Sequence, residues 1–134
     1  MKRSQLRELA FQIIFQIDVG QNDPHTALEE RFAENPLNPQ EKEFCSQLVL
    51  GTYAHIAEID KKIEEYAFEW KVERMLSVDR NLLRLAVYEM LFDSTTPAKV
   101  AVNEALELAK IFGSEESPKF INGILGQIIK NHGE

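Results

Sequence analysis

Residues 97–126 read PAKVAVNEALELAKIFGSEESPKFINGILG and combine two helix patterns with a short acidic and polar link. Apolar residues of the first pattern recur every three or four positions, as on one face of a helix: Ala101, Ala105, Leu108 and Phe112. We expect Gly113 to end this helix in the left-handed conformation that glycine adopts easily. Ser117 and Pro118 are expected to be the cap and the first residue of a second helix. That helix carries its own apolar stripe: Ile121, Ile124, Leu125 and Ile128.

Lys119 and Phe120 stand at the start of the second predicted helix. Free backbone N–H groups and a lysine attract phosphate, and an aromatic ring can stack on a base. The spot therefore suits a nucleic acid, although helix starts with Lys and Phe are also common in proteins that bind no ligand. Gly123 and Gly126 follow in the same helix, and we interpret their spacing as a site of close helix packing rather than an RNA clamp.

The residues before this stretch also repeat with a helical period, and they lack the strict apolar alternation of a strand. Residues 4–19 are expected to form a helix with a clean apolar stripe, and Gly20 is expected to end that helix. Asp23 and Pro24 have the pattern of a cap and first turn that open a short helix. Asn38 opens the clearest capping box, NPQE. The apolar pattern after it is long, and the sequence leaves open whether it forms one kinked helix or two.

Residues 77–91 form a pattern that is apolar almost all round, as suits a helix in the middle of a domain, and Ser77 is expected to cap it. Arg84 stands among these apolar residues, and a buried guanidinium needs a carboxylate. We expect Glu104 or Glu107, on the next helix, to pair with it. In total the chain predicts an all-α fold, a compact bundle of six or seven helices.

The composition is that of one globular domain spanning residues 1–134, with 44% hydrophobic and 28% charged residues. No apolar run approaches the roughly 18 residues of a membrane span, and no signal-peptide core follows Met1. Cys45, the single cysteine, cannot form an internal disulfide and lies in an apolar pattern, so we expect it to be buried. These features predict a cytoplasmic protein that does not associate with membranes.

The net charge of −7 opposes indiscriminate binding to nucleic acid, because the field of the whole molecule repels phosphate. This field does not prevent a local basic site. Residues 1–7 include Lys2, Arg3 and Arg7 and no acid. They fit either a set of phosphate contacts or a solvated, frayed terminus.

The sequence lacks the common motifs of catalysis and metal binding. His25, His55 and His132 lie far apart and have no metal-ligand spacing. The signatures of serine hydrolases, P-loops and dinucleotide-binding folds are also missing. We therefore predict a binding module, not an enzyme, with no cofactor and no metal.

Four blocks of the sequence resemble the NusB family of bacterial transcription antitermination factors, along almost the whole chain. They are residues 7–19 (RELAFQIIFQIDV), 51–70, 78–91 (VDRNLLRLAVYEML) and 97–125. The last two are highly specific in combination and in order. The resemblance implies two packed helical subdomains that bind ribosomal protein NusE and, together with it, single-stranded boxA RNA. It also implies that this pair joins other Nus factors on RNA polymerase and suppresses premature termination, which supports ribosomal RNA transcription.

The resemblance further implies two binding surfaces. The RNA surface consists of Lys2, Arg3, Arg7, Glu116, Lys119 and Phe120. The NusE surface consists of Phe15, Trp70, Arg74 and Asp79. The opening segment has fewer arginines than is typical of the family, which predicts weaker RNA binding by the isolated protein and more reliance on NusE. The alternative is a helical scaffold that pairs only with proteins or with itself as a homodimer, since the acidic net charge also fits that role.

Overall fold

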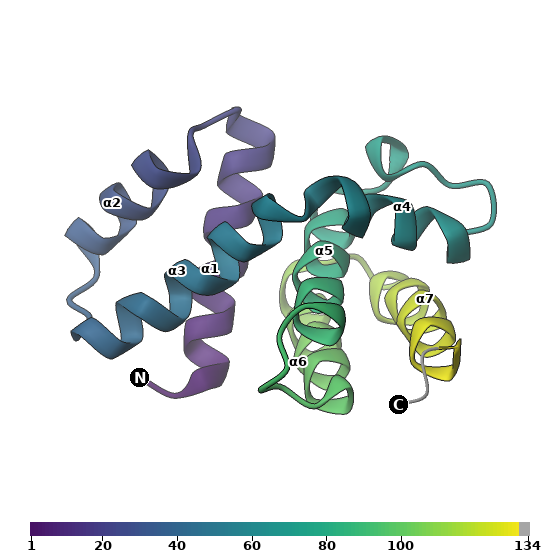
Figure 1. The fold of residues 1–134 in the computed structure, drawn as a ribbon. Helices are drawn as coiled ribbons and strands as arrows, with labels where there is room; N and C mark the ends of the chain where they lie inside the picture. The colour runs from purple at the N-terminus through teal and green to yellow at the C-terminus, as the bar shows by residue number, and fades with distance from the viewer. Residues whose placement is uncertain (132–134) are drawn as a thin grey trace.

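The structure, a computed structural model, describes residues 1–131 and contains helices and no strand over that range (Figure 1). Its elements are α1 (Arg3–Gly20), α2 (Pro24–Glu34), α3 (Pro39–Ala54), α4 (Ile56–Tyr66), a 3₁₀ turn (Val72–Arg74), α5 (Ser77–Leu91), α6 (Ala98–Phe112) and α7 (Ser117–Asn131). The all-α prediction is confirmed, with seven α-helices in the described part of the chain. His132 lies outside the described residues.

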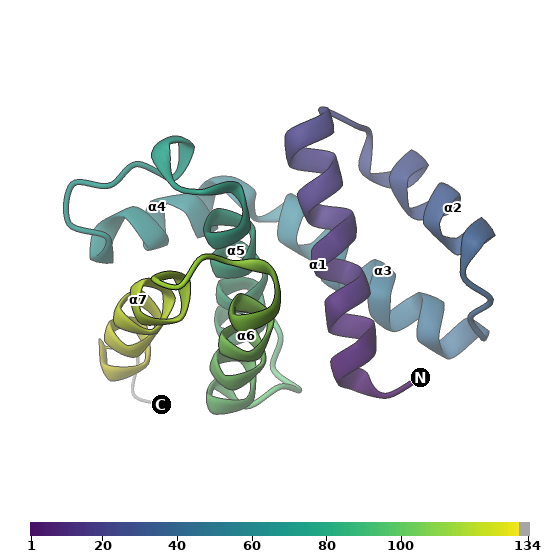
Figure 2. The ribbon, with the colours of Figure 1, turned by 180° about the vertical axis from the view of Figure 1, so that it is seen from behind.

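The helices form two packed groups that meet along α1 and α5 (Figures 1 and 2). In the first group α1 packs on α2 and α3, and in the second α5 packs on α4, α6 and α7. Contacts of α1 with α5 and α6 join the groups into one apolar core, so the expected two-part helical arrangement is confirmed. The predicted central helix α5 is buried almost all round, by residues that include Leu82, Leu83, Leu85, Ala86, Val87 and Tyr88.

Two predicted helix starts have the expected hydrogen bonds. Before α2, Oδ2 of Asp23 accepts a hydrogen bond from the N–H of Thr26 at 3.0 Å. Before α3, the N–H of Glu41 donates to Asn38 at 2.8 Å, and the N–H of Asn38 donates to Glu41 at 3.0 Å. These caps satisfy N–H groups that the first turn of a helix leaves without partners, so the local sequence explains where both helices begin.

The first helix ends at Gly20 as predicted, but the end of α6 differs from the prediction. Gly20 is the last residue of α1, and Gln21 takes the left-handed conformation, at φ 55°. Gly113 follows α6 in an extended conformation, at φ −92° and ψ −175°, so it is not left-handed. A Cβ at Gly113 would lie 2.5 Å from Oγ of Ser117. The glycine therefore provides space for Ser117 and not conformational freedom.

The predicted serine caps are also corrected. Helix α5 begins at Ser77 itself, and no side chain caps it. Ser117 lies in the first turn of α7, and its Oγ accepts a hydrogen bond from the N–H of Ser114 at 2.9 Å. Ser117 therefore stabilises the link between α6 and α7 instead of standing before the helix as a cap.

The long helical pattern after the capping box is two helices, α3 and α4. His55 lies between them at φ −118° and ψ 20°, outside helical geometry. Near the end of α3, a Cβ at Gly51 would overlap the ring of Tyr88. Only glycine therefore allows α3 to approach α5 this closely before the chain turns into α4.

Arg84 forms the internal ion pair that the sequence predicts, but with a different acid. Its Nε and Nη2 donate to the two carboxylate oxygens of Asp60 at 2.8 and 2.9 Å. Its Nη1 lies 3.5 Å from Oδ1 of Asp18. The expected pairing with Glu104 or Glu107 is wrong, because the helix packing brings these acids to basic residues on α1 and on α6 itself.

Asp18 on α1 is the common acceptor of a polar cluster between the two groups of helices. Nη2 of Arg80 and Nδ2 of Asn81 donate to its Oδ2 at 2.6 and 2.9 Å. Burial by itself would raise the pKa of Asp18, but hydrogen bonds from Asn81 and Arg80 and the nearby guanidinium charges hold the pKa below its usual value. Together with the pairing of Arg84, these contacts tie α1, α4 and α5 to one another.

Cys45 is fully buried in the core, as the sequence predicts, and burial raises the pKa of its thiol to about 12. Because the thiolate is the reactive form, this cysteine is chemically inert at neutral pH. Within residues 1–131, no helix combines the length and apolar character that crossing a membrane requires.

Candidate nucleic-acid and protein interface

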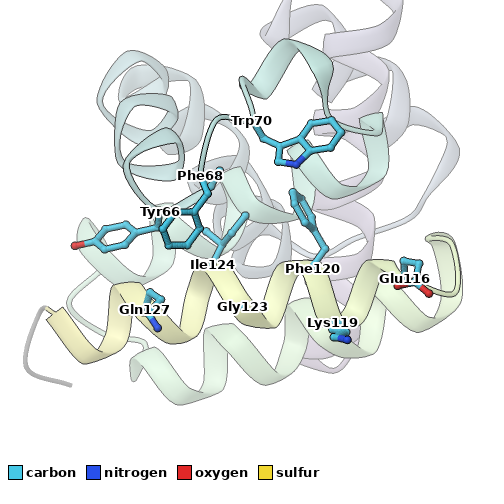
Figure 3. Close-up of a pocket in the computed structure, with 10 residues that line it drawn as sticks. Tyr66, Phe68, Trp70, Glu116, Lys119, Phe120, Gly123, Ile124 and Gln127 are labelled. Carbon is cyan, nitrogen blue, oxygen red and sulfur yellow. The ribbon is translucent and has the colours of Figure 1, made fainter.

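A hollow of about 640 Å³ lies between α7 and the turn that follows α4 (Figure 3). We call it the aromatic groove; its lining is Tyr66, Ala67, Phe68, Trp70, Glu116, Lys119, Phe120, Gly123, Ile124 and Gln127. The rings of Trp70 and Phe120 meet edge to face, with centroids 6.4 Å apart and planes at 77°. The groove therefore brings the predicted RNA residue Phe120 next to the predicted NusE residue Trp70.

The turn holding Phe68 and Trp70 presents both rings to solvent, with 80% of Phe68 and 51% of Trp70 exposed. Phe68 and Glu69 have φ of 45° and 73°. Positive φ is uncommon for residues other than glycine, and it concentrates at functional positions because the surrounding structure must hold it. Exposed aromatic rings on a constrained turn indicate a surface for binding.

A second hollow of about 280 Å³, the Asp79 pocket, adjoins the aromatic groove. It shares three lining residues with the groove, Trp70, Glu116 and Phe120, and adds Arg74, Met75, Leu76, Asp79 and Ser114. Only 5% of Asp79 is exposed, and within residues 1–131 its buried Oδ1 has no hydrogen-bond partner. Burial raises the pKa of Asp79 above its usual value, although the hydroxyl of Ser117 offsets this in part. A buried carboxylate oxygen without a donor is costly, and a donor from a partner would relieve that cost.

Phe15 borders a third hollow, of about 320 Å³, between α1, the end of α6 and the start of α5. The lining is Phe11, Gln12, Phe15, Val78 and Phe112. Val78 directly precedes Asp79 on α5, but this hollow shares no lining residue with the Asp79 pocket. Of the predicted NusE residues, the structure brings Trp70, Arg74 and Asp79 together around the Asp79 pocket, where Arg74 is exposed. Phe15 is half-buried and lines the separate third hollow.

The N-terminal segment is attached to the helices around it. The guanidinium of Arg3 lies 3.9 Å from the ring centroid of Phe44, and the amino group of Met1 pairs with Glu41. The hydroxyl of Ser4 donates to Glu104 at 2.8 Å. Lys2 and Arg3 remain exposed, so these contacts hold two cations at the surface, unlike a frayed terminus.

Arg7 has a different place from the other two basic residues. It is only 6% exposed, and its Nε lies 3.0 Å from both carboxylate oxygens of Glu89. Its Nη1 also lies 3.5 Å from Glu104. Because its guanidinium is paired in the interior, Arg7 does not present its charge to solvent, and we leave it out of the proposed RNA surface.

Lys2 and Arg3 are separated from Lys119 and Phe120. Helices α1 and α6 lie side by side, with Ser4 bonded to Glu104 and the ring of Phe11 against that of Phe112 at 5.3 Å. The eight residue steps from Glu104 to Phe112 span about 12 Å of helix, and α7 begins beyond them. The N-terminus and the link between α6 and α7 therefore lie at opposite ends of α6 (Figure 2). The predicted RNA residues form two separate patches and not one.

Several residues of the groove have no place in the sequence predictions. Tyr66, Phe68 and Gln127 are among them. The sequence signal that could have indicated the groove is the pair of aromatic residues Phe68 and Trp70, just beyond the end of α4. Gly123 and Gly126 were expected to mark close helix packing, which is wrong, because a Cβ at either position would meet no atom within 4 Å among the described residues. Gly123 instead lies in the groove.

Replacing Asp79 by Asn should raise the free energy of unfolding by about 1 kcal/mol at pH 7. The buried carboxylate lacks a full set of donors, and the favourable field at the start of α5 recovers only part of its cost. Because the native pKa of Asp79 is raised, the native state binds this proton more readily than the unfolded state. The gain in unfolding free energy should therefore be largest at pH values above the native pKa of Asp79. It should vanish at pH values below the pKa of Asp79 in the unfolded chain, about 3.9.

Urea denaturation followed by circular dichroism over a range of pH measures this effect. Glu115→Gln, at an exposed position of the link, makes the same change in charge and should alter stability by less than about 0.5 kcal/mol. A loss of stability in the Asp79 variant would mean that the carboxylate already has a stabilising partner inside the protein.

Comparison with known proteins identifies the chain. The family model that matches it, over residues 4–130, is described as the NusB family. The transcription antitermination protein NusB of Desulforamulus reducens is 51% identical over 134 residues, covering 100% of this chain and 94% of that protein. The protein of the same name from Bacillus pumilus is 42% identical, covering 96% of this chain and 95% of that one.

Solved structures agree with the sequence relatives. NusB of T. maritima superimposes with a TM-score of 0.92 at 37% identity, covering 100% of this chain and 94% of that chain. A chain from a crystal structure of the antitermination factors NusB and NusE in complex with double-stranded RNA gives a TM-score of 0.87 at 30% identity, covering 98% and 99%. The match of sequence and of fold extends over the whole described molecule, and the chain belongs to the NusB family.

Proposed function

We propose that this chain is a transcription antitermination factor that binds boxA-type single-stranded RNA together with ribosomal protein NusE. The pair helps to assemble an antitermination complex with other Nus factors on RNA polymerase, and so supports transcription of ribosomal RNA. Relatives that carry the name transcription antitermination protein support this proposal, and the likeness to a chain solved with NusE and double-stranded RNA supports its RNA and NusE parts.

The observation that carries the proposal is the setting of Phe120. Its ring is partly exposed at the start of α7, beside exposed Lys119 and Glu116, and it lines both the aromatic groove and the Asp79 pocket. A base can stack on the ring while Lys119 neutralises a phosphate. Glu116 can accept a hydrogen bond from an N–H of the base edge. Recognition of unpaired bases by rings and side chains is the usual mode for single-stranded RNA.

The second patch, Lys2 and Arg3, extends the proposed RNA surface. Because it lies beyond α6 from Phe120, one nucleotide cannot reach both patches. We propose that the RNA strand runs along this side of the molecule, from the start of α7 toward the N-terminus. Two patches with few cations on an acidic protein give modest affinity, which fits a factor that needs NusE for tight binding.

The proposed NusE surface is the region formed by Phe15, Trp70, Arg74 and Asp79. Apolar hollows flank Phe15 and Trp70, and the buried Oδ1 of Asp79 needs a donor. A lysine, arginine or N–H of the partner would supply it, so Asp79→Asn should weaken NusE binding while it stabilises the free protein. Since Trp70 and Phe120 touch, NusE and RNA would lie side by side, which accounts physically for joint binding.

The proposed activity is assembly, in the cytoplasm, by one domain, with no bond made or broken. Among the described residues, no group of three or more His, Cys, Asp and Glu side chains is placed to hold a metal ion. The buried charged side chains have structural partners: Arg7, Glu89 and Arg84 are in internal ion pairs, Asp93 accepts hydrogen bonds from Thr95 and Thr96, and Asp79 lines the Asp79 pocket. An enzyme would need an activated nucleophile or an acid and base in a cleft, and no such set lines the hollows described above.

Phe120→Ala should weaken binding of a labelled boxA-type RNA by about 1–3 kcal/mol, the typical contribution of one stacked base. Fluorescence anisotropy in the presence and absence of NusE measures this effect. For the unchanged protein we expect NusE to tighten RNA binding in a sequence-dependent manner.

Ile111→Ala is the matched control, because Ile111 is an exposed apolar residue at the end of α6 and lines none of the hollows described above. It should leave RNA affinity unchanged. If Phe120→Ala lowers only thermal stability and keeps its RNA affinity in the cold, Phe120 is a packing residue and not an RNA contact. Absence of RNA binding by the intact protein, with and without NusE, would favour a helical scaffold that binds only proteins or itself.

A further inference from the structure

The aromatic groove extends well beyond Phe120, along α7 as far as Gln127 (Figure 3). We propose that it is a second base subsite, in which the turn after α4 and the Gly123 face of α7 hold one unpaired nucleobase next to the base at Phe120. This inference rests on the proposed RNA binding and adds residues to it. The occupant is a single nucleobase of the bound RNA strand.

The shape of the groove suits a flat ring. The side chains of Phe68 and Trp70 come from the turn on one side of the groove. Those of Phe120 and Ile124 come from α7 on the other side (Figure 3). Between them Gly123 leaves bare helix backbone, since a Cβ there would meet no atom of residues 1–131 within 4 Å. The volume of about 640 Å³ lies in the range of small-molecule sites, so it has room for a base with its sugar.

The chemistry of the lining also fits a base. The aromatic rings offer faces for stacking, which tolerates any of the four bases. Lys119 at one end can meet the phosphate, and the amide of Gln127 toward the other can both donate to and accept from a base edge. An apolar segment of a protein partner would use the rings but would leave Lys119 and Gln127 without a role.

The groove shares Trp70 with the proposed NusE surface, but most of its lining lies away from the Asp79 pocket. The unsatisfied carboxylate oxygen that calls for a protein donor is in the Asp79 pocket, on the other side of Trp70 and Phe120. The groove continues from Phe120 in the opposite direction, along α7. A strand whose base stacks on Phe120 therefore has its neighbouring base at the mouth of the groove.

Gly123→Met tests the subsite, because the new side chain fills the groove from its floor. Gly126→Met is the matched control, since Gly126 is equally open on the same helix and does not line the groove. Both changes replace a glycine inside a helix, so neither should reduce helix stability. Phe68→Asn is an independent second variant, which removes a largely exposed ring and tolerates the positive φ.

Trp70 is the only tryptophan of the chain, so its emission reports directly on the groove. Adding boxA-type RNA to the preformed complex with NusE should quench this emission in the unchanged protein and in Gly126→Met. Gly123→Met should lose the quenching and bind RNA about tenfold more weakly, as should Phe68→Asn. An RNA in which one nucleotide lacks its base should bind the unchanged protein about tenfold more weakly than the intact RNA does. Gly123→Met should bind the abasic RNA and the intact RNA with equal affinity.

Other outcomes overturn the inference in distinguishable ways. If RNA binds Gly123→Met as tightly as the unchanged protein and leaves Trp70 emission unaltered, the groove holds no base, while the proposed function stands. If Gly123→Met weakens binding of NusE without RNA, the groove belongs to the protein partner. If the unchanged protein binds no RNA, with or without NusE, both the subsite and the RNA part of the proposed function fail.

Discussion

Replacing Arg7 by Met should lower the free energy of unfolding by about 3–5 kcal/mol, the usual loss when one partner of a buried ion pair is removed. Glu89 is only 2% exposed, and Arg7 donates to both of its carboxylate oxygens. Without the guanidinium, a buried carboxylate loses its main donor. Urea denaturation followed by circular dichroism measures the loss, and RNA affinity measured well below the melting temperature should stay within about twofold, or 0.4 kcal/mol.

The pH dependence of this loss follows from the pKa of Glu89. Burial holds that pKa above its usual value despite the attraction of Arg7, and removing Arg7 raises it further. The native variant then takes up a proton more readily than its unfolded state, so its stability relative to the unchanged protein recovers as the pH falls through the native pKa. The deficit should be largest at neutral pH and smaller in mild acid.

Arg3→Met is the matched control for Arg7→Met, because Arg3 is an exposed basic residue on the same helix. It should change stability by less than about 1 kcal/mol, the small value expected for an exposed cation that contacts an aromatic ring. It should reduce RNA affinity if Arg3 contacts phosphate. A stable Arg7→Met variant with poor RNA binding would contradict the internal pairing and return Arg7 to the RNA surface.

Arg84→Met should also cost about 3–5 kcal/mol of unfolding free energy. The guanidinium joins Asp60 of α4 to Asp18 of α1 from its own position on α5. Removing it leaves Asp60 without that donor and takes away one of the charges that lower the pKa of Asp18. The pair with Asp60 lies within the second group of helices, and the contact with Asp18 crosses to the first, so part of the loss falls on the junction that unites the two groups.

Chemical denaturation of Arg84→Met checks this prediction, with Lys62→Met as the control. Lys62 pairs with Glu65 on the surface of α4, three residues away, and such exposed pairs contribute less than about 1 kcal/mol. We expect one cooperative transition for the unchanged protein, since both groups share one core. Two separate transitions would show that the groups fold independently, and an Arg84 variant as stable as the control would contradict the role of the junction.

The helices themselves were predictable because their signals are local. The capping box of Asn38 and Glu41 spans four residues, and the all-round apolar pattern of α5 is visible within its own length. The break at His55 was not predictable. The close approach of Gly51 to the ring of Tyr88, just before the break, involves another helix and is likewise recorded by no local pattern.

The candidate site was predictable only where it is local. Lys119 and Phe120 stand out in the sequence because a cation and a ring at a helix start have a recognisable chemistry. Trp70 joins them only because α4 packs on α7, which places the turn after α4 over Phe120. The open backbone at Gly123 also depends on how the helices pack. The spacing of two glycines in the sequence does not show whether another helix covers them.

The sequence by itself determined which segments are helical and where two of the best-capped helices begin, because apolar periods and caps act within one or two turns of chain. Only the tertiary structure decided which charges are internal and which face solvent. Arg84 pairs with Asp60, 24 residues away in the sequence, and Arg7 pairs with Glu89, 82 residues away. The faces that meet when helices pack depend on every side chain between them, so these pairings cannot be derived from the neighbours of either residue in the sequence.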